Sequence, residues 1–145
     1  MNLLRAIAEI GRLVATRVTA LSSFYDTQPV GEVNQETFLN AVLKLESAFT
    51  PQELLAELQR IETTIFRRVR TIHWGPRPMD LDILFFGDHV LTEEELIIPH
   101  PRLHERGFVL VPLVEIAPDF IHPVLRSNVS ELLASLKTTE RVTLV

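Results

Sequence analysis

Residues 38–70, FLNAVLKLESAFTPQELLAELQRIETTIFRRVR, decide the fold because they join a strand to a helix. Apolar side chains alternate with others over residues 38–46, which predicts a half-buried strand. Thr50 and Glu53 then form a T-x-x-E capping box, with Pro51 at the first helical position. The pattern predicts a helix over residues 51–70 that buries Leu54, Leu55, Leu58 and Ile61 on one face.

The flanking segments extend this pattern into an alternation of helices and strands. Apolar residues at helical spacing predict an amphipathic helix over residues 3–14. Residues 17–25 are β-branched and aromatic, and residues 80–86, DLDILFF, are almost continuously apolar, so both predict strands. Later segments predict a loop with a helical turn within 95–107, a buried helix within 108–118, a capped helix over 127–136 and an edge strand over 141–145.

The central order, helix-strand-strand-helix-strand, predicts an α+β protein, a ferredoxin-like αβ sandwich with an antiparallel sheet. Such a sandwich begins with one more strand before the first helix, and we expect this first strand to be missing from residues 1–145. Loss of a central strand leaves backbone groups unpaired. We therefore expect the chain as written to be less stable or less active than an extended form. The 145 residues fit a single domain over 1–145.

Composition excludes several classes of protein. The chain has 14 Lys and Arg against 19 Asp and Glu, a net charge of −5, which argues against a protein that binds duplex nucleic acid through phosphates. There are no cysteines, which excludes disulfides, thiolate catalysis and sulfur-ligated zinc. Apolar runs are too short to span a membrane, and charges interrupt the N-terminal helix too early for a secretory signal. The composition predicts a soluble, cytoplasmic protein.

Residues 74–82, WGPRPMDLD, carry the most informative chemistry. Side chains two apart on a strand share a face, so Asp80 and Asp82 point the same way with their Cα atoms roughly 6.6 Å apart. Mg²⁺ binds one or two carboxylates together with phosphate oxygens and waters. The spacing favours a magnesium site as much as its alternative, in which the acids stay solvated or pair with Arg77.

Basic residues gather near the acidic pair in this otherwise acidic chain. Arg67, Arg68 and Arg70 lie at the end of the predicted helix, and Arg77 precedes Asp80 by three residues. Arginine provides planar donors that hold phosphate oxygens. A run of solvated charges is the ordinary interpretation of such residues. Their place beside a carboxylate pair in a Pro-Gly loop favours a polyphosphate–Mg²⁺ site.

Three further residues are weaker candidates. His100 lies between two prolines in IIPHPRLHERGF and could contact a phosphate, or serve as a hydrogen-bonded loop histidine. Phe38 and Asn40 share a strand face that could bind a flat heterocycle, although an aromatic packed under a loop is the more ordinary interpretation. The sequence contains no P-loop motif.

The motifs WGPRPMDLDILFFG and PHPRLHERGFVLVPLVEIAP, with SSFYDTQPVG, FLNAV and QRIE before them, resemble the family of 6-hydroxymethyl-7,8-dihydropterin pyrophosphokinases of folate biosynthesis. The resemblance covers roughly residues 3–125. It implies a ferredoxin-like αβ fold and transfer of pyrophosphate from ATP, the co-substrate, to the pterin hydroxymethyl group. It also implies two Mg²⁺ ions as cofactors.

The resemblance assigns roles residue by residue. It implies that Asp80 and Asp82 bind the metal and that Arg67 and Arg77 act with them in catalysis. Phe38 and Phe108 are expected to sandwich the pterin, with Asn40 on the pterin edge. The remaining pterin contacts that it implies are the Thr27 and Val30 backbone and Trp74. The nucleotide and phosphate contacts that it implies are Gln59, Glu62, Arg67, Arg70, Arg77, His100 and Arg106.

The chain also departs from the family pattern in its basic loop. Phe66 stands where the family has glycine, Val69 where an ungapped alignment has arginine, and His73 where arginine precedes the tryptophan. One alternative function is a pterin- or nucleotide-binding pseudoenzyme. Another is a truncated fragment whose missing strand comes from a second chain. The expected partners are the small-molecule substrates alone, and the expected state is a monomer.

Overall fold

The computed structural model describes residues 2–29, 38–69, 79–137 and 140–145, and it divides the chain into two compact units. The first unit contains Met1–Val18 and Leu45–Ile83, and the second contains Thr19–Lys44 and Leu84–Val145. Helices and antiparallel strands are mixed, which confirms the predicted α+β class. No helix within the described ranges is long and apolar enough to span a membrane.

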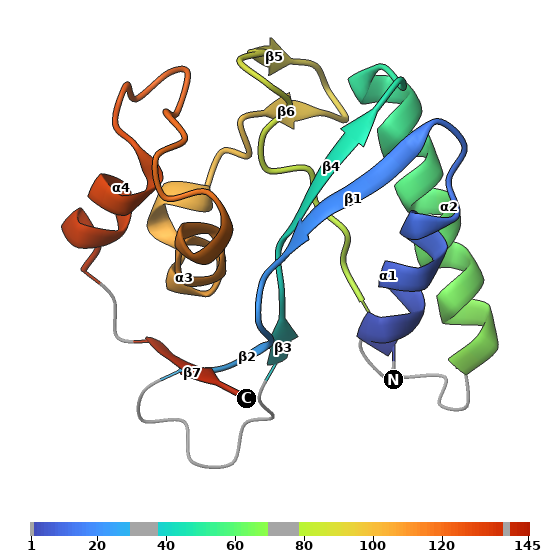
Figure 1. Ribbon diagram of the computed structural model, residues 1–145, viewed down its shortest axis with the longest axis horizontal. Coiled ribbons are helices and arrows are strands. Elements are labelled where there is room, and N and C mark those ends of the chain that lie inside the picture. The colour runs from blue at the N-terminus through green and yellow to red at the C-terminus, as the bar shows by residue number, and fades with distance from the viewer. Residues whose placement is uncertain (1, 30–37, 70–78, 138–139) are drawn as a thin grey trace. The chain divides into compact units, whose positions relative to one another are not determined.

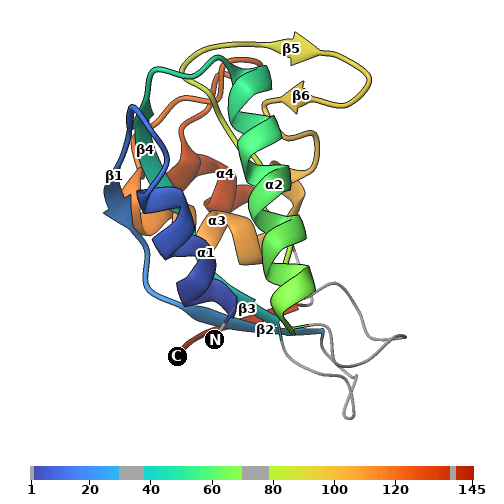
Figure 2. The same ribbon diagram turned by 90° about the vertical axis from the view of Figure 1, so that its right-hand side faces the viewer.

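Two helices form the core of the first unit. Helix α1 (Asn2–Gly11) and helix α2 (Pro51–Val69) lie against each other, as both views show (Figures 1 and 2). The apolar side chains of α2 recur every three or four residues, so they fall on one face of the helix and become buried there. Among the described side chains, the buried hydrophobic residues of these two helices and the turn after α1 are Ala6, Ile10, Leu13, Leu54, Leu58, Ile61 and Ile65.

The predicted capping box at the start of α2 is confirmed. The Thr50 N–H donates to Glu53 Oε1 at 2.8 Å, and the Glu53 N–H donates to Thr50 Oγ1 at 3.2 Å. These two bonds satisfy backbone donors that have no partner within the helix. The structure describes α2 as far as Val69, and the predicted end, Arg70, lies outside the described residues.

Each of the two strands predicted before α2 is broken into two. Residues 17–25 become β1 (Thr16–Leu21) and the start of β2 (Tyr25–Pro29), while residues 38–46 become β3 (Phe38–Asn40) and β4 (Leu43–Ser47). The breaks coincide because Ser22 pairs with Val42. The Ser22 N–H donates to the Val42 carbonyl at 2.9 Å, whereas the Val42 N–H donates to Ser22 Oγ at 2.8 Å. A side-chain hydroxyl thus replaces a backbone carbonyl and interrupts the ladder.

A helical layer packs on a small sheet in the second unit (Figure 1). Strand β2 is flanked by β3 and by β7 (Glu140–Leu144), both antiparallel, and β7 confirms the predicted C-terminal edge strand. Helix α3 (Gly107–Ile116) lies against all three strands and against helix α4 (Val129–Ser135). The buried cluster of this unit consists of Leu103, Leu110, Leu113 and Val129.

Shorter elements complete the second unit. Strands β5 (Leu91–Thr92) and β6 (Ile97–Ile98) form an antiparallel pair, and the predicted helical turn is the 3₁₀ helix η1 (Leu103–Glu105). Helix α4 begins with a reciprocal capping box, in which Asn128 Oδ1 accepts from the Glu131 N–H at 2.8 Å. These contacts are local, which is why sequence patterns predicted the helical turn and the capped helix.

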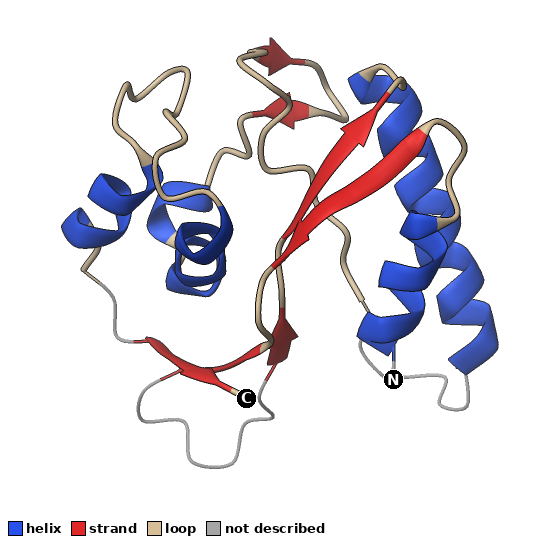
Figure 3. Cartoon of the chain, viewed as in Figure 1, coloured by secondary structure: helices blue, strands red, loops and turns tan. Residues whose placement is uncertain are grey.

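The strand predicted over residues 80–86 is wrong. This segment, between the end of α2 and β5, is drawn as a loop (Figure 3). Its backbone groups find partners outside any ladder. The Leu81 N–H donates to the Glu62 carboxylate at 2.6 Å, and the Leu84 carbonyl accepts from the His100 N–H at 2.9 Å. Ile83 of this apolar segment is buried, but the segment pairs with no strand of the described structure.

Candidate active site

The two acids predicted to bind metal are exposed on the same side of their segment. Asp80 and Asp82 are exposed, the intervening Leu81 is half-buried, and Ile83 is buried. This alternation is the pattern of an extended chain in which residues two apart share a side. Both carboxylates are therefore exposed, and the alternation favours one shared side of this segment in the first unit.

The donor chemistry of this pair fits a hard divalent cation. Carboxylate oxygens are ligands that Mg²⁺ prefers, and Mg²⁺ takes its other ligands from waters and phosphates. Among the described residues, no cluster of three or more His, Asp or Glu side chains could hold a metal ion by itself. A pair of carboxylates suits a cation that arrives with a phosphate better than it suits a cation enclosed by protein.

Helix α2 carries two residues predicted to contact the nucleotide, Gln59 and Glu62, and they differ in exposure. Gln59 is exposed, whereas Glu62 is half-buried and accepts the backbone N–H of Leu81 at 2.6 Å. A bond from a backbone amide to an ionised carboxylate is stronger than a neutral one. The structure therefore brings Glu62 to the backbone between Asp80 and Asp82, a contact that the sequence analysis did not anticipate.

In the second unit, strand pairing joins two predicted pterin contacts. Thr27 is 4% exposed, and the Asn40 Nδ2 donates to Thr27 Oγ1 at 3.0 Å. The β2–β3 register places Tyr25 opposite Asn40 and Thr27 opposite the backbone of Phe38. The hydrogen bond orients the Asn40 amide, which a side chain needs if it is to bind the edge of a heterocycle.

Arg106 and Phe108 come together at the start of α3. Arg106 is the N-cap residue of this helix, and its guanidinium carbon lies 5.5 Å from the centroid of the Phe108 ring. This is the geometry of a cation–π contact, which contributes about 0.5–1 kcal/mol at exposed sites. The contact links a predicted phosphate-binding arginine to a predicted pterin-stacking ring.

His100 is held by its own loop. Its Nδ1 accepts the Arg102 N–H at 3.2 Å, and its backbone N–H donates to the Leu84 carbonyl at 2.9 Å. The first bond identifies Nδ1 as the acceptor nitrogen, so Nε2 is the ring atom that carries the proton in the neutral side chain. A protonated Nε2 is a suitable donor for a phosphate oxygen.

Glu115, which no sequence motif indicated, makes several hydrogen bonds to Tyr25 at the start of β2 and to Ser23 just before it. Its carboxylate accepts the Ser23 N–H at 2.9 Å, the Ser23 hydroxyl at 2.8 Å and the Tyr25 hydroxyl at 2.7 Å. The hydrogen bonds from Tyr25 and Ser23 lower the pKa of Glu115, and the same bond to Glu115 raises the pKa of Tyr25. The only sequence signal was one charged residue in the otherwise apolar run 107–117.

Replacement of Glu115 by glutamine is expected to destabilise the protein most at neutral pH. A carboxyl group whose pKa falls on folding stabilises the native state above its ordinary pKa of 4.5, and this stabilisation is lost as the pH falls further. Urea denaturation should give the variant a lower midpoint at pH 7 and a smaller difference from wild type at pH 3. Glu94→Gln, at an exposed position of the same unit, is the control. An equal difference at both pH values would contradict the role of the carboxylate charge.

Some predicted site residues cannot be placed. Val30, Arg70, Trp74 and Arg77 lie outside the described residues. Arg67 belongs to α2 and Phe38 to β3, but their side chains also lie outside the described part of the chain. Their roles remain predictions.

Comparisons with known proteins agree with the resemblance. A family model described as 7,8-dihydro-6-hydroxymethylpterin-pyrophosphokinase matches residues 1–118. The chain is 46% identical over 118 residues to the 2-amino-4-hydroxy-6-hydroxymethyldihydropteridine pyrophosphokinase of Haemophilus influenzae, covering 81% of this chain and 73% of that protein. The protein of the same name from Bacillus subtilis is 46% identical to the chain over 112 residues, which cover 77% of this chain and 66% of that protein. The one from Synechocystis sp. is 40% identical over 138 residues, which cover 95% of this chain and 70% of that protein. None of these similarities supports the pseudoenzyme alternative.

Proposed function

The chain belongs to the 7,8-dihydro-6-hydroxymethylpterin-pyrophosphokinase family, and from this premise we propose that it transfers pyrophosphate from ATP to 6-hydroxymethyl-7,8-dihydropterin in folate biosynthesis. It is thus a transferase that acts on small molecules. The observation that carries the proposal is the shared exposure of Asp80 and Asp82, both within the matched residues 1–118. Two exposed carboxylates on one side of a segment suit the recognition of a metal–polyphosphate.

The proposed reaction is a displacement at phosphorus. The pterin hydroxyl oxygen forms a bond to the β-phosphorus of ATP, the bond from that phosphorus to the α,β-bridging oxygen breaks, and AMP leaves while the hydroxyl loses its proton. Such transfers depend on positioning and charge neutralisation more than on covalent catalysis. Arg67 and Arg77 are proposed to hold the phosphate oxygens. Asp80 and Asp82 would hold two Mg²⁺ ions, which when bound neutralise phosphate charge.

The proposed pterin pocket is built on the second unit. Asn40, oriented by Thr27, would bind the polar edge of the heterocycle, and Phe108 would stack on its face. Phe38, the Val30 backbone and Trp74 complete the pocket in this proposal. The nucleotide would be bound by Gln59, Arg70, His100 and Arg106, in addition to the catalytic arginines, with Glu62 considered below.

Organisation, partners and location complete the proposal. The family model matches residues 1–118 and so includes parts of both units, which supports a single domain over 1–145. The net charge of −5 supports small-molecule substrates without a nucleic-acid partner. A cytoplasmic location is proposed because the reaction consumes ATP and the chain has no cysteine for disulfides. A monomer is proposed as the state of the protein.

The direct test is to incubate the purified chain with ATP, Mg²⁺ and the hydroxymethyl pterin and to separate the nucleotides. AMP should accumulate in a 1:1 ratio with the pyrophosphorylated pterin, and only when the pterin is present. Formation of ADP would show that a single phosphate is transferred. Tight binding of both substrates without AMP would establish the pseudoenzyme instead.

In the same assay, replacement of Phe108 by alanine should raise the KM for the pterin more than the KM for ATP, which it affects only through the Arg106 contact. Aromatic stacking contributes about 0.5–1.5 kcal/mol beyond burial, so we expect an increase of roughly two- to tenfold. Phe86→Ala, the same change at a half-buried ring beside a turn of the same unit, is the control. An unchanged pterin KM would mean that Phe108 serves only to pack the start of α3.

A further inference from the structure

Glu62 is hydrogen-bonded to the backbone of residues 79–83, the segment that carries Asp80 and Asp82 and is called the acidic segment below. Its carboxylate accepts the Leu81 N–H at 2.6 Å, and both residues are half-buried. Leu81 separates Asp80 from Asp82, so this bond holds the Asp80–Leu81 peptide, one of the two peptide groups between the candidate metal ligands. A short bond between an amide and an ionised carboxylate is a strong restraint on that peptide.

The restraint matters because the acidic segment has no strand ladder to hold it. Residues 79–86 belong to no strand of the described structure. The directions of Asp80 and Asp82 therefore depend on the torsions around Leu81. Rotation of the peptide between Asp80 and Leu81 would turn the two carboxylates relative to each other, because their shared side follows from an extended backbone. A hydrogen bond to the Leu81 N–H opposes this rotation directly.

Glu62 is not itself suited to bind the metal. Among the described residues, Glu62 does not join Asp80 and Asp82 in a group able to hold a cation. One of its oxygens is engaged by a backbone donor, and such a bond also reduces its ability to accept from a nucleotide. The bond observed thus differs from the nucleotide contact that the family resemblance implies.

We propose that Glu62 is a positioning residue that fixes the Asp80–Asp82 backbone, so that both carboxylates face the same metal-bound polyphosphate. This inference rests on the proposed function of the acidic pair. A positioning role requires an acceptor at this place and not a negative charge as such. Glutamine should therefore substitute for Glu62 far better than leucine, which has a similar size and no acceptor.

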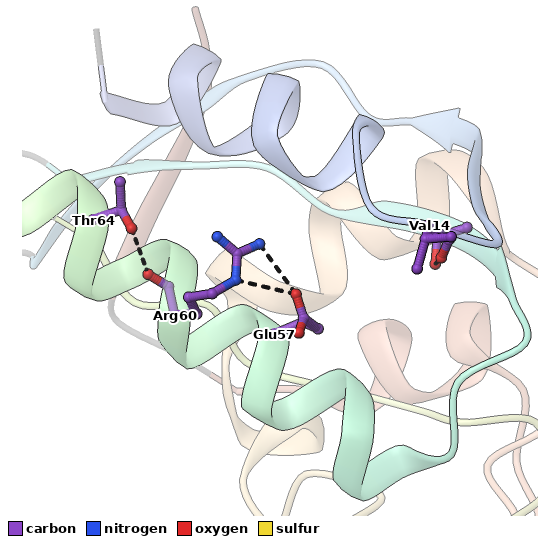
Figure 4. A network of polar contacts seen from close by, with 5 residues as sticks. Val14, Glu57, Arg60 and Thr64 are labelled. Atoms are coloured by element: carbon purple, nitrogen blue, oxygen red, sulfur yellow. Dashed lines mark hydrogen bonds and ion pairs between the residues drawn. The ribbon is translucent and has the colours of Figure 1, made fainter.

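The test compares Glu62→Leu and Glu62→Gln with a matched pair of variants at Glu57. Glu57 lies on the same helix, where it pairs with Arg60 at 3.1 Å, and Thr64 bonds to the Arg60 carbonyl on the same side (Figure 4). Changes at Glu57 therefore remove a helix carboxylate without reaching the acidic segment. Hydrogen exchange of residues 79–83 and binding of α,β-methylene-ATP are measured for all variants.

We expect Glu62→Leu to raise the Mg²⁺ concentration needed for half-maximal binding of the analogue at least tenfold and to accelerate amide exchange in residues 79–83. Glu62→Gln should recover most of both properties, and the Glu57 variants should match wild type. The proposal would be overturned if Glu62→Leu weakened binding of the analogue equally with and without Mg²⁺ and left amide exchange in residues 79–83 unchanged. That result would show that Glu62 contacts the nucleotide. Failure of Gln to recover what Leu loses would also overturn it.

The wild-type protein provides a check that does not depend on variant folding. The Leu81 amide, followed by NMR, should exchange at least tenfold more slowly than an unprotected amide of the same sequence. Exchange at the unprotected rate would overturn the proposal. Neither measurement requires turnover, so the role of Glu62 is tested separately from the proposed reaction. A protein that binds the analogue with Mg²⁺ but forms no AMP would contradict the proposed function, and the exchange and binding data would still decide the role of Glu62.

Discussion

Replacement of Asp82 by alanine is expected to reduce AMP formation about a thousandfold at saturating ATP and Mg²⁺. The variant would lose one of two carboxylates that face solvent from the same side of the acidic segment. Metal-ion stabilisation of phosphoryl charge is worth several kcal/mol, and each 1.36 kcal/mol corresponds to a factor of ten in rate. The loss should appear in kcat, since the pterin contacts belong to other residues. Turnover is measured by AMP release, and pterin affinity by calorimetry.

Two variants make this result specific. Asp88→Ala removes an exposed carboxylate from the turn at Gly87, outside the proposed site, and should retain wild-type turnover. Asp82→Asn keeps one oxygen donor but loses the charge, so its activity should lie between those of wild type and the alanine variant. Near-normal transfer by Asp82→Ala would remove this residue from the metal site.

Replacement of Leu110 by alanine should produce a comparably large effect on stability. Leu110 is 0% exposed and packs in the cluster with Leu103, Leu113 and Val129. The substitution removes buried methyl groups and leaves a cavity in the core. Leucine-to-alanine changes of this kind lower the free energy of unfolding by about 2–5 kcal/mol. This is a large part of the about 5–15 kcal/mol by which native proteins are stable. Urea denaturation, followed by circular dichroism, measures the change.

The matched control is the same substitution at an exposed leucine of the same unit. Leu125 is 42% exposed, so Leu125→Ala should change the free energy of unfolding by less than about 0.5 kcal/mol. The pterin KM should also rise in Leu110→Ala, because Leu110 and Phe108 lie on the same helix, α3. Equal effects of the two leucine substitutions would show that the cluster around Leu110 does not stabilise the fold.

Sequence by itself determined the elements whose signals are local. The capping boxes at Thr50 and Asn128 are formed by residues three apart. Helix α2 begins where the Thr50 pair predicts, and α4, predicted as a capped helix over 127–136, begins at Val129. The helical spacing of Leu54, Leu55, Leu58 and Ile61 likewise predicted their burial on one face of α2, and all are buried except Leu55, which is half-buried. The motif WGPRPMDLDILFFG indicated the family from its residues alone, because this combination of residues is specific. Local hydrogen bonds and fixed periodicities are properties of a short stretch of chain.

Only the tertiary structure decided which distant groups meet. The Ser22–Val42 pair divided two predicted strands into four, since the hydroxyl entered the ladder from a residue twenty positions away. The bonds of Glu62 to Leu81 and of Glu115 to Tyr25 join residues 19 and 90 positions apart. Apolar composition predicted residues 80–86 as a strand, but a strand also requires a neighbouring chain to accept and donate its backbone bonds. Such partners are chosen by the folding of the whole chain, and no local pattern in the sequence specifies them.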